Sequence, residues 1–165
     1  MLLEKLIQTD YDGTSGLYVC VIPTPKSADL LVAIGSALGL EVSREELHVT
    51  LMYSITPARK SSVNWADTMA SETWRAVVEG IDLFGKNKDH LVVTLDSYPM
   101  DQEHAFLTQM GANHSWSEFK PHCTLGKMGA GVDSSMIKRV ATLIKGRELF
   151  FGQYKWSNLS EDENE

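Results

Sequence analysis

The stretches His48-Val-Thr-Leu51 and His122-Cys-Thr-Leu125 share one pattern, a histidine and a threonine two residues apart followed by leucine. In a β-strand such side chains point to the same face and lie about 7 Å apart, because the rise is roughly 3.3 Å per residue. A single tripeptide of this kind occurs by chance in many proteins. Two copies in equivalent positions of a repeated pattern favour one shared site in which the two histidines face each other.

Similar elements are expected before each motif. A β-branched, apolar run that stops at Pro23 predicts a buried strand at 16–22. Further strands are predicted at 46–53, 73–84, 90–96, 119–125 and 148–156. Helical spacing predicts helices at 27–38, 99–113 and 134–144, with Ser27 and Asp101 as possible caps. Residues 54–71 are expected to form a polar connection or a short helix. A strand and a helix therefore precede each His-x-Thr strand, which predicts a weakly duplicated α+β domain with two lobes.

The bulk composition indicates one globular domain. The chain has 165 residues, of which 43% are hydrophobic, and a chain of this length usually forms a single core. We expect residues 1–158 to form a single bilobed domain and residues 159–165 to form a disordered acidic tail. The longest apolar runs are far shorter than the roughly 20 residues that cross a bilayer. The N-terminus lacks the features of a signal peptide, so we expect a cytoplasmic protein that does not bind membranes.

The formal net charge of −7 bears on the ligand. Affinity for long nucleic acid depends on many lysine and arginine contacts to phosphates, which an acidic protein disfavours. We therefore expect no long nucleic acid as a partner, and any anionic ligand to be small. The oligomeric state does not follow from the sequence.

The cysteines and the other histidines show no metal-binding pattern. Cys20 and Cys123 lie in apolar runs without a CxxC partner, so we expect buried thiols rather than a disulfide. His90, His104 and His114 lack the spacing of metal ligands and are expected at the surface. The sequence therefore predicts no metal and no cofactor.

The paired motifs suit the cleavage of a phosphodiester. This reaction needs a base that takes the proton of the nucleophile and an acid that protonates the leaving oxygen. Imidazole titrates near pH 6.5, at about the pH where one ring can be neutral and another protonated. His48 and His122 can supply both functions, and the hydroxyls of Thr50 and Thr124 can donate hydrogen bonds to the non-bridging phosphate oxygens. Which histidine is the acid stays open.

The two motifs, His48-Val-Thr-Leu51 and Pro121-His-Cys-Thr-Leu125, resemble those of the 2H phosphoesterase superfamily, including their spacing. That superfamily includes the 2′-5′ RNA ligase-like proteins and the cyclic phosphodiesterases. The resemblance implies two antiparallel sheets around a central groove with helices outside. It also implies metal-free acid–base chemistry on nucleotide phosphodiesters.

A closer resemblance lies in the small size, the acidic balance and the opening Leu6-Ile-Gln-Thr-Asp-Tyr-Asp-Gly-Thr-Ser-Gly-Leu-Tyr18. These features are similar to the phage anti-CBASS cyclic-oligonucleotide phosphodiesterases. The resemblance implies hydrolysis of 3′-5′ linkages in cyclic di- and trinucleotide immune signals, such as cyclic GMP–AMP, which infected bacteria make. It implies action in the host cytoplasm. Base preference and ring size are not determined.

Four further residues are candidates for substrate binding. Tyr11, in a polar loop, and Trp156, near the end of the last strand, are candidates for stacking on bases, which contributes about 1–3 kcal/mol per base. Glu148 is a candidate acceptor for a base amino group, and Lys120 is a candidate for steering the phosphate. For each of the four, ordinary packing or a solvated surface position is the alternative. Trp65, Trp74 and Trp116 are expected in the core or in the groove wall.

Two other functions fit the same motifs. Processing of RNA ends, by opening 2′,3′-cyclic phosphates or by 2′-5′ ligase-like chemistry, would use the same four residues on another substrate. A non-catalytic module that sequesters a nucleotide would keep the groove after losing activity. Because both His-x-Thr motifs are complete, the sequence favours an enzyme.

Overall fold

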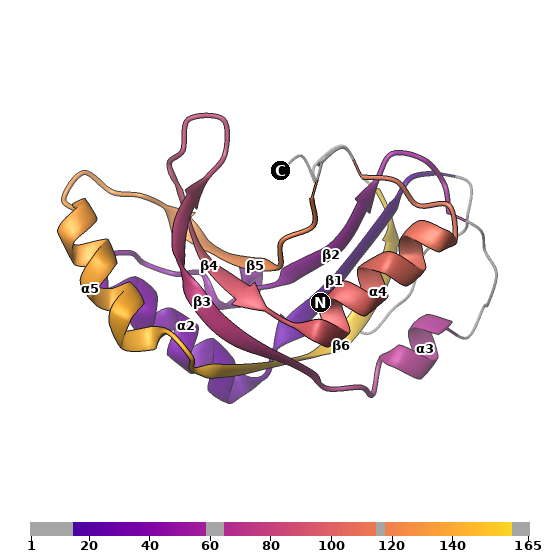
Figure 1. The fold of residues 1–165 in the computed structure, drawn as a ribbon, viewed down its shortest axis with the longest axis horizontal. Helices are drawn as coiled ribbons and strands as arrows, with labels where there is room; N and C mark the ends of the chain where they lie inside the picture. The colour runs from indigo at the N-terminus through magenta and orange to yellow at the C-terminus, as the bar shows by residue number, and fades with distance from the viewer. Residues whose placement is uncertain (1–14, 59–64, 115–117, 160–165) are drawn as a thin grey trace.

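The computed structural model describes residues 15–58, 65–114 and 118–159. Helices and strands follow one another along the chain as shown in Figure 1, in the order β1 (Leu17–Pro23), α2 (Pro25–Ala37), the 3-10 turn η1 (Arg44–Glu46), β2 (Val49–Ser54), α3 (Trp65–Met69), β3 (Trp74–Phe84), β4 (His90–Asp96), α4 (Tyr98–Gln109), β5 (His122–Lys127), α5 (Ser134–Ile144) and β6 (Glu148–Asn158). The predicted α+β class is confirmed. Tyr11, Trp116 and residues 160–165 of the expected acidic tail lie outside the described residues.

The strands pair antiparallel in the closed order β1-β2-β5-β4-β3-β6. β3 and β6, each 11 residues long, join two halves of this sheet. The first part of β3 pairs with the first part of β6, from Trp74 opposite Phe151 to Val77 opposite Glu148. Beyond that crossing, β3 pairs with β4, whereas β6 pairs with β1. The two sheets expected from the resemblance are therefore two halves of one continuous sheet. They are continuous because β3 and β6 pair with each other at one end and with strands of different halves at the other end.

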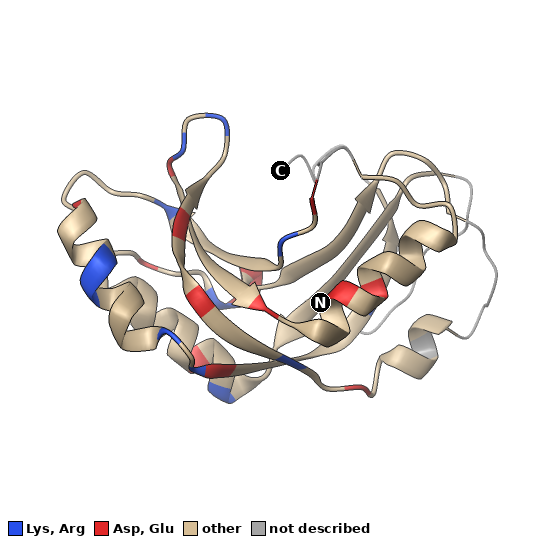
Figure 2. Cartoon of the chain, viewed as in Figure 1, with Lys and Arg blue, Asp and Glu red and all other residues tan. Residues whose placement is uncertain are grey.

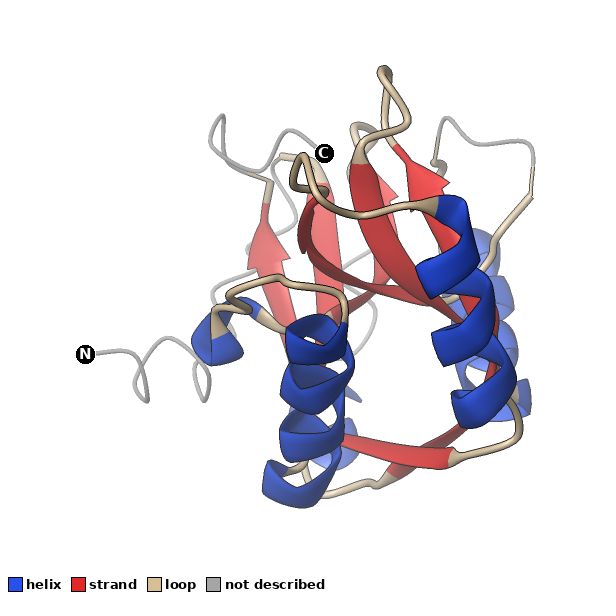
Figure 3. Ribbon diagram, turned by 90° about the vertical axis from the view of Figure 1, so that its left-hand side faces the viewer, coloured by secondary structure: helices blue, strands red, loops and turns tan. Residues whose placement is uncertain are grey.

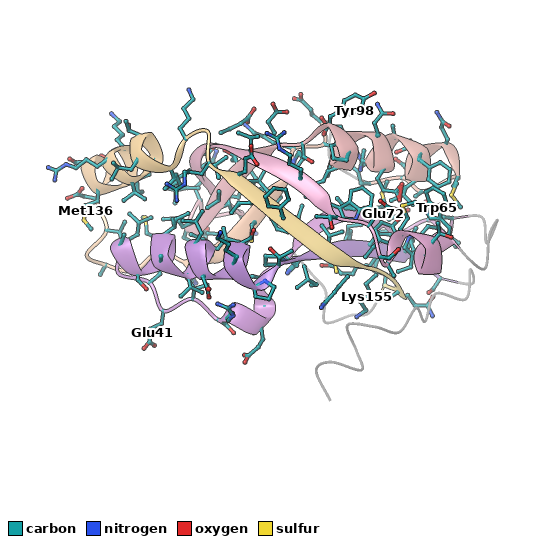
Figure 4. The ribbon with its side chains drawn as sticks, turned by 90° about the horizontal axis from the view of Figure 1, so that it is seen from below. Glu41, Trp65, Glu72, Tyr98, Met136 and Lys155 are labelled. Atoms are coloured by element: carbon teal, nitrogen blue, oxygen red, sulfur yellow. The ribbon has the colours of Figure 1, made fainter. Side chains whose placement is uncertain are left out.

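Helices pack against the sheet at both ends of the molecule. Figures 1 and 3 show α2 and α5 at one end, and Figure 1 shows α3 and α4 at the other. Seen from below in Figure 4, β6 crosses between these two ends. Leu31 and Ile34 of α2 and Met100 and Leu107 of α4 are buried against the strands. Among the described residues, no helix is both long enough and apolar enough to span a membrane.

Two helices begin earlier than their sequence signals predict. α2 begins at Pro25, and the Ser27 hydroxyl accepts from the backbone N–H of Phe150 instead of capping the helix. α4 begins at Tyr98, and the Ser97 hydroxyl caps it by accepting from the backbone N–H of Met100, so Asp101 is not the cap. In both helices a proline stands in the first turn, where its missing N–H has no partner to lose.

The core runs through both halves of the sheet and includes fully buried leucines from four strands, Leu17, Leu51, Leu91 and Leu149. Cys20 and Cys123 are buried free thiols, as expected. Cys123 packs in this core, whereas Cys20 lines the cavity described below. Burial raises the pKa of the Cys123 thiol to about 12, which keeps it protonated at neutral pH. This thiol is therefore a packing group and not a nucleophile.

Candidate active site

The four motif residues lie in one cavity of about 990 Å³. Thr50 enters it from β2 and His48 from the residue just before β2, whereas His122 and Thr124 enter it from β5. Other walls come from β1, η1, the β3–β4 hairpin and β6, so both halves of the sheet contribute. Motifs far apart in the sequence thus share a single site.

The register of β2 and β5 brings the motifs together. Val49 pairs with Cys123, and both side chains are completely buried. In an antiparallel pair this register places His48 opposite Thr124 and Thr50 opposite His122. Because side chains alternate along a strand, these four residues face away from the core and towards the cavity. Each histidine therefore lies across from the threonine of the other motif, in an approximately two-fold arrangement.

The two imidazoles make equivalent hydrogen bonds. The Nδ1 atom of His48 lies 2.7 Å from the carbonyl oxygen of Glu46, and the Nδ1 atom of His122 lies 2.9 Å from the carbonyl oxygen of Lys120. A carbonyl oxygen only accepts, so Nδ1 of each ring carries the hydrogen. Nε2 is therefore the atom that gains or loses a proton in each ring. Both rings therefore have the same tautomer, in which Nε2 can accept or donate a proton.

An aromatic ring packs beside each imidazole. Tyr18 of β1 lies edge-on to His48, with ring centroids 6.4 Å apart. Phe84 at the end of β3 lies edge-on to His122, with centroids 4.7 Å apart. Both aromatic side chains also line the cavity. A backbone carbonyl and an aromatic ring therefore fix the orientation of each imidazole from two directions.

The two threonines differ in their surroundings. Thr50 is buried, with 6% of its surface exposed, and its hydroxyl lies 3.2 Å from the hydroxyl of Tyr18. Thr124 is half-buried and pairs with Val92 of β4. Tyr18 therefore holds the hydroxyl of one motif, which makes the approximate two-fold arrangement chemically unequal.

Charged side chains of both signs line the cavity. Lysines enter from the β3–β4 hairpin, from the segment before β5 and from β6, at Lys86, Lys120 and Lys155. Glu45 and Glu46 of η1 lie on the His48 side, and Glu118 precedes β5. The cavity therefore offers cations to an anionic ligand although the chain as a whole is acidic. Within the described part of the chain, no group of three His, Cys, Asp or Glu side chains is arranged to hold a metal ion.

Comparison with known proteins decides the family. The family model described as "Anti-CBASS protein Acb1" matches residues 15–155, which include both motifs and nearly every strand in full. The chain belongs to this family. It is 33% identical over 132 residues to the anti-CBASS protein Acb1 of Escherichia phage RB16, covering 78% of this chain and 73% of the relative. It is 29% identical over 118 residues to that of Enterobacteria phage T4, covering 69% and 73%.

Solved structures show that this member of the Acb1 family shares its fold with more distant proteins. The protein TT0787 of Thermus thermophilus aligns over 86% of this chain and 84% of its own, with a TM-score of 0.53 and 14% identity. A protein described as a phosphoesterase aligns over 88% and 96%, with a TM-score of 0.51 and 12% identity. The resemblance to the anti-CBASS proteins is confirmed, and the fold is shared with a protein described as a phosphoesterase.

Two of the predicted base contacts are corrected. Trp156 is buried in the core, with 4% of its surface exposed, and its Nε1 atom donates to the hydroxyl of Tyr154 at 2.6 Å. Its neighbour Lys155 lines the cavity instead. Glu148 is exposed on the first part of β6, where it forms an ion pair of 2.9 Å with Arg75, and it does not line the cavity.

A β-bulge explains why Trp156 turns inward. The register between β1 and β6 shifts between the pairs Cys20–Lys155 and Ile22–Gly152, and Gln153 adopts a positive φ of 49° in between. An extra residue in a strand reverses which side chains face the core. Odd-numbered residues of β6 are buried before the bulge, and Tyr154 and Trp156 are buried after it.

Of the remaining substrate-binding candidates, Lys120 lines the cavity and Tyr11 lies outside the described residues.

Sequence patterns did not single out several residues of the cavity wall. Tyr18 and Phe84 stand in strands where an aromatic residue is ordinary packing, so only their contacts reveal a role. His104 was expected at the surface but is half-buried, with its Nδ1 atom 2.8 Å from the carbonyl oxygen of Leu51. Its ring stacks on Phe119, which lines the cavity, at 4.1 Å between centroids. Burial lowers the pKa of His104 below its ordinary value.

Proposed function

We propose that the chain is a metal-independent phosphodiesterase that hydrolyses 3′-5′ linkages of small cyclic di- and trinucleotides and thereby opposes CBASS defence. One observation carries the proposal: both complete His-x-Thr motifs line a single cavity, with each histidine across from the threonine of the other motif. Membership of the anti-CBASS family supports the biological setting and the choice of substrate class.

The histidines divide the two proton transfers between them. One neutral imidazole takes the proton of the ribose 2′-hydroxyl through Nε2, and the 2′-oxygen attacks phosphorus. The bond from phosphorus to the 5′-oxygen breaks, and the other imidazole, protonated, gives its Nε2 proton to that oxygen. The products of this step are a 2′,3′-cyclic phosphate and a 5′-hydroxyl. Hydrolysis is completed when the ring that gave its proton takes one from water, the water oxygen attacks phosphorus, and the other ring protonates the 2′-oxygen as its bond to phosphorus breaks. Because His48 and His122 have equivalent Nδ1 hydrogen bonds, the arrangement allows either ring to begin as the base.

The threonine hydroxyls stabilise the phosphate as negative charge develops on its oxygens. A hydroxyl has one hydrogen to donate and can accept from a second group. When Tyr18 donates to the oxygen of Thr50, the hydrogen of Thr50 is directed to a non-bridging phosphate oxygen. Thr124 supplies the corresponding donor from β5. Tyr18 therefore acts as a positioning residue through Thr50.

The size and charge of the site favour a compact substrate. A volume of about 990 Å³ is at the upper end of the roughly 300–1,000 Å³ of small-molecule sites. The net charge of −7 disfavours a long polyanion, whereas the cavity itself supplies lysines. A cyclic di- or trinucleotide meets both conditions.

The decisive experiment is a substrate panel in EDTA. Purified protein is incubated with cyclic dinucleotides, cyclic trinucleotides, a linear dinucleoside monophosphate, 2′,3′-cyclic mononucleotides and long single-stranded RNA, and products are separated by chromatography. We expect the cyclic oligonucleotides to be cleaved fastest and EDTA to leave the rate unchanged. An analogue that lacks the 2′-hydroxyl at the cleaved linkage should bind and resist cleavage.

Each other outcome identifies a different function. Preference for 2′,3′-cyclic phosphates or for RNA ends would assign RNA-end processing to the same four residues. Tight binding without turnover of any substrate would indicate a sequestering module. Activity that is lost in EDTA and restored by a divalent ion would contradict the two-histidine mechanism, and efficient cleavage of the deoxy analogue would show attack by water.

A further inference from the structure

The β3–β4 hairpin forms one wall of the cavity beside His122. Its last strand pair joins Phe84 to His90, and the turn closes with the N–H of Lys88 donating to the carbonyl oxygen of Gly85 at 3.0 Å. Gly85 has a φ of +98°, and a Cβ atom there would lie 2.6 Å from Nδ1 of His90. The positive φ favours glycine at this position, and the absence of a side chain leaves room for the His90 ring beside the turn. Figure 1 shows the hairpin rising above the sheet.

The hairpin and the segment before β5 place lysines near His122. Lys86, two residues after Phe84, and Lys120, two residues before His122, both line the cavity. His122 contacts both segments, because its ring packs on Phe84 and its Nδ1 donates to the carbonyl of Lys120. Figure 2 shows the basic tip of the hairpin.

The carboxylates that the structure describes near the hairpin do not form ion pairs with Lys86 or Lys120. Asp89, at the end of the turn, lies 3.4 Å from Nζ of Lys127 and 3.2 Å from Nδ1 of His90. Among the described residues, no carboxylate forms an ion pair with Lys86 or Lys120. Glu45 and Glu46 lie in η1 beside His48, and Glu118 is the acidic side chain of the cavity on the β5 segment. The hairpin and the β5 segment therefore bring two lysines and Glu118 to the cavity, whereas η1 brings two glutamates and β6 brings Lys155.

A cyclic oligonucleotide brings more than one phosphate into the cavity. When one phosphate lies between His48 and His122, another must lie elsewhere in the same enclosure, where a cation stabilises its charge. We infer that Lys86, together with Lys120, binds the phosphate of a cyclic oligonucleotide that is not being cleaved. This inference rests on the proposed function and specifies its substrate class: the preferred ligand carries a second phosphate on the hairpin side.

The test compares two lysines of one turn. Lys86 lines the cavity, whereas Lys88 of the same exposed turn does not. Lys86→Gln and Lys88→Gln remove the same charge from nearly the same place, so long-range steering changes equally in both variants. KM and kcat are measured for a cyclic dinucleotide, which has two phosphates, and for a linear dinucleoside monophosphate, which has one.

We expect Lys86→Gln to raise KM for the cyclic dinucleotide by roughly tenfold or more, as for loss of a charge-assisted hydrogen bond. Its kcat/KM for the linear substrate should stay within about twofold of the wild-type value, because that substrate has no second phosphate to lose. Lys88→Gln should resemble the wild type on both substrates. Adding Lys120→Gln to Lys86→Gln should raise KM for the cyclic dinucleotide further.

Several results would overturn the inference. If Lys86→Gln lowers kcat/KM equally on both substrates, Lys86 acts on the cleaved phosphate or on the fold. If the Lys86 and Lys88 variants change KM equally, the effect comes from the net charge of the turn and not from a specific site. If the wild type cleaves the cyclic dinucleotide and Lys86→Gln has the same KM and kcat, the second-phosphate site is wrong and the proposed function is unaffected. If the wild type cleaves nothing, the proposed function fails, and calorimetric binding of the deoxy cyclic analogue to the same variants still tests the subsite.

Discussion

Val49 of β2 lies opposite Cys123 of β5, and this pair joins two motifs that are far apart in the sequence. Both side chains are completely buried, so the residues on either side of each one face the cavity. The packing of two small apolar side chains in the core therefore fixes the geometry of four polar ones. The proposed acid–base chemistry depends on that register.

The histidine pair is the first point to test. His48→Ala and His122→Ala should each lower kcat by about 10²–10⁴, the usual contribution of a general acid or base. The double variant should be little worse than either single one, because residues that act as a unit have non-additive effects. Steady-state rates on a cyclic dinucleotide, with ligand binding measured separately, check this.

The control for these variants is His114→Ala. His114 packs against His104 and does not line the cavity, so its removal should leave kcat near the wild-type value. A variant lacking His48 or His122 that still turned over at the wild-type rate would exclude that residue from the mechanism.

Tyr18→Phe tests the positioning of Thr50. The variant keeps the ring beside His48 and loses the hydroxyl that lies 3.2 Å from that of Thr50. A net hydrogen bond is worth about 0.5–1.5 kcal/mol, so we expect kcat to fall roughly twofold to tenfold with little change in KM. Tyr53→Phe is the matched control, because Tyr53 packs on Tyr18 but does not line the cavity. Equal rates in the Tyr18 variant and the wild type would remove this role.

Trp156→Ala should act on stability and not on base recognition. Its indole is buried beside Tyr154, whose hydroxyl in turn donates to the buried carboxylate of Glu103. Truncating a buried tryptophan costs about 3–5 kcal/mol, so we expect a large drop in the unfolding midpoint. Thermal unfolding followed by circular dichroism measures this. A variant that unfolds like the wild type but binds substrate weakly would instead support a contact between Trp156 and a base.

The pH dependence of stability should carry a contribution from His104. Burial lowers the pKa of His104 below 6.5, so the unfolded chain binds this proton more tightly than the folded one. The stabilisation is complete above pH 6.5 and is lost as the pH falls from 6.5 through the lower folded pKa. Denaturant unfolding of the wild type and of His104→Gln at a series of pH values should differ in slope in this window. Parallel curves for the two proteins would contradict the assignment.

The sequence by itself determined most of the elements and the catalytic candidates. Local patterns suffice for these, since apolar spacing alone predicted the helix at Ser134–Ile144 that α5 occupies, and the structure adds Asp133 as its cap. Alternation around His48 and His122 likewise places each histidine and its threonine on one face. The catalytic role of these four residues stays a prediction from the motifs and the geometry.

Only the tertiary structure decided which side chains complete the site. The pairing of Val49 with Cys123 joins strands that are far apart in the chain, and no local pattern encodes that register. The bulge at Gln153 reverses the alternation of β6, so Lys155 faces the cavity and Trp156, which was predicted to stack on a base, enters the core. The physical reason is that a strand pattern gives period and not phase: long-range pairing and a single inserted residue set which face is buried.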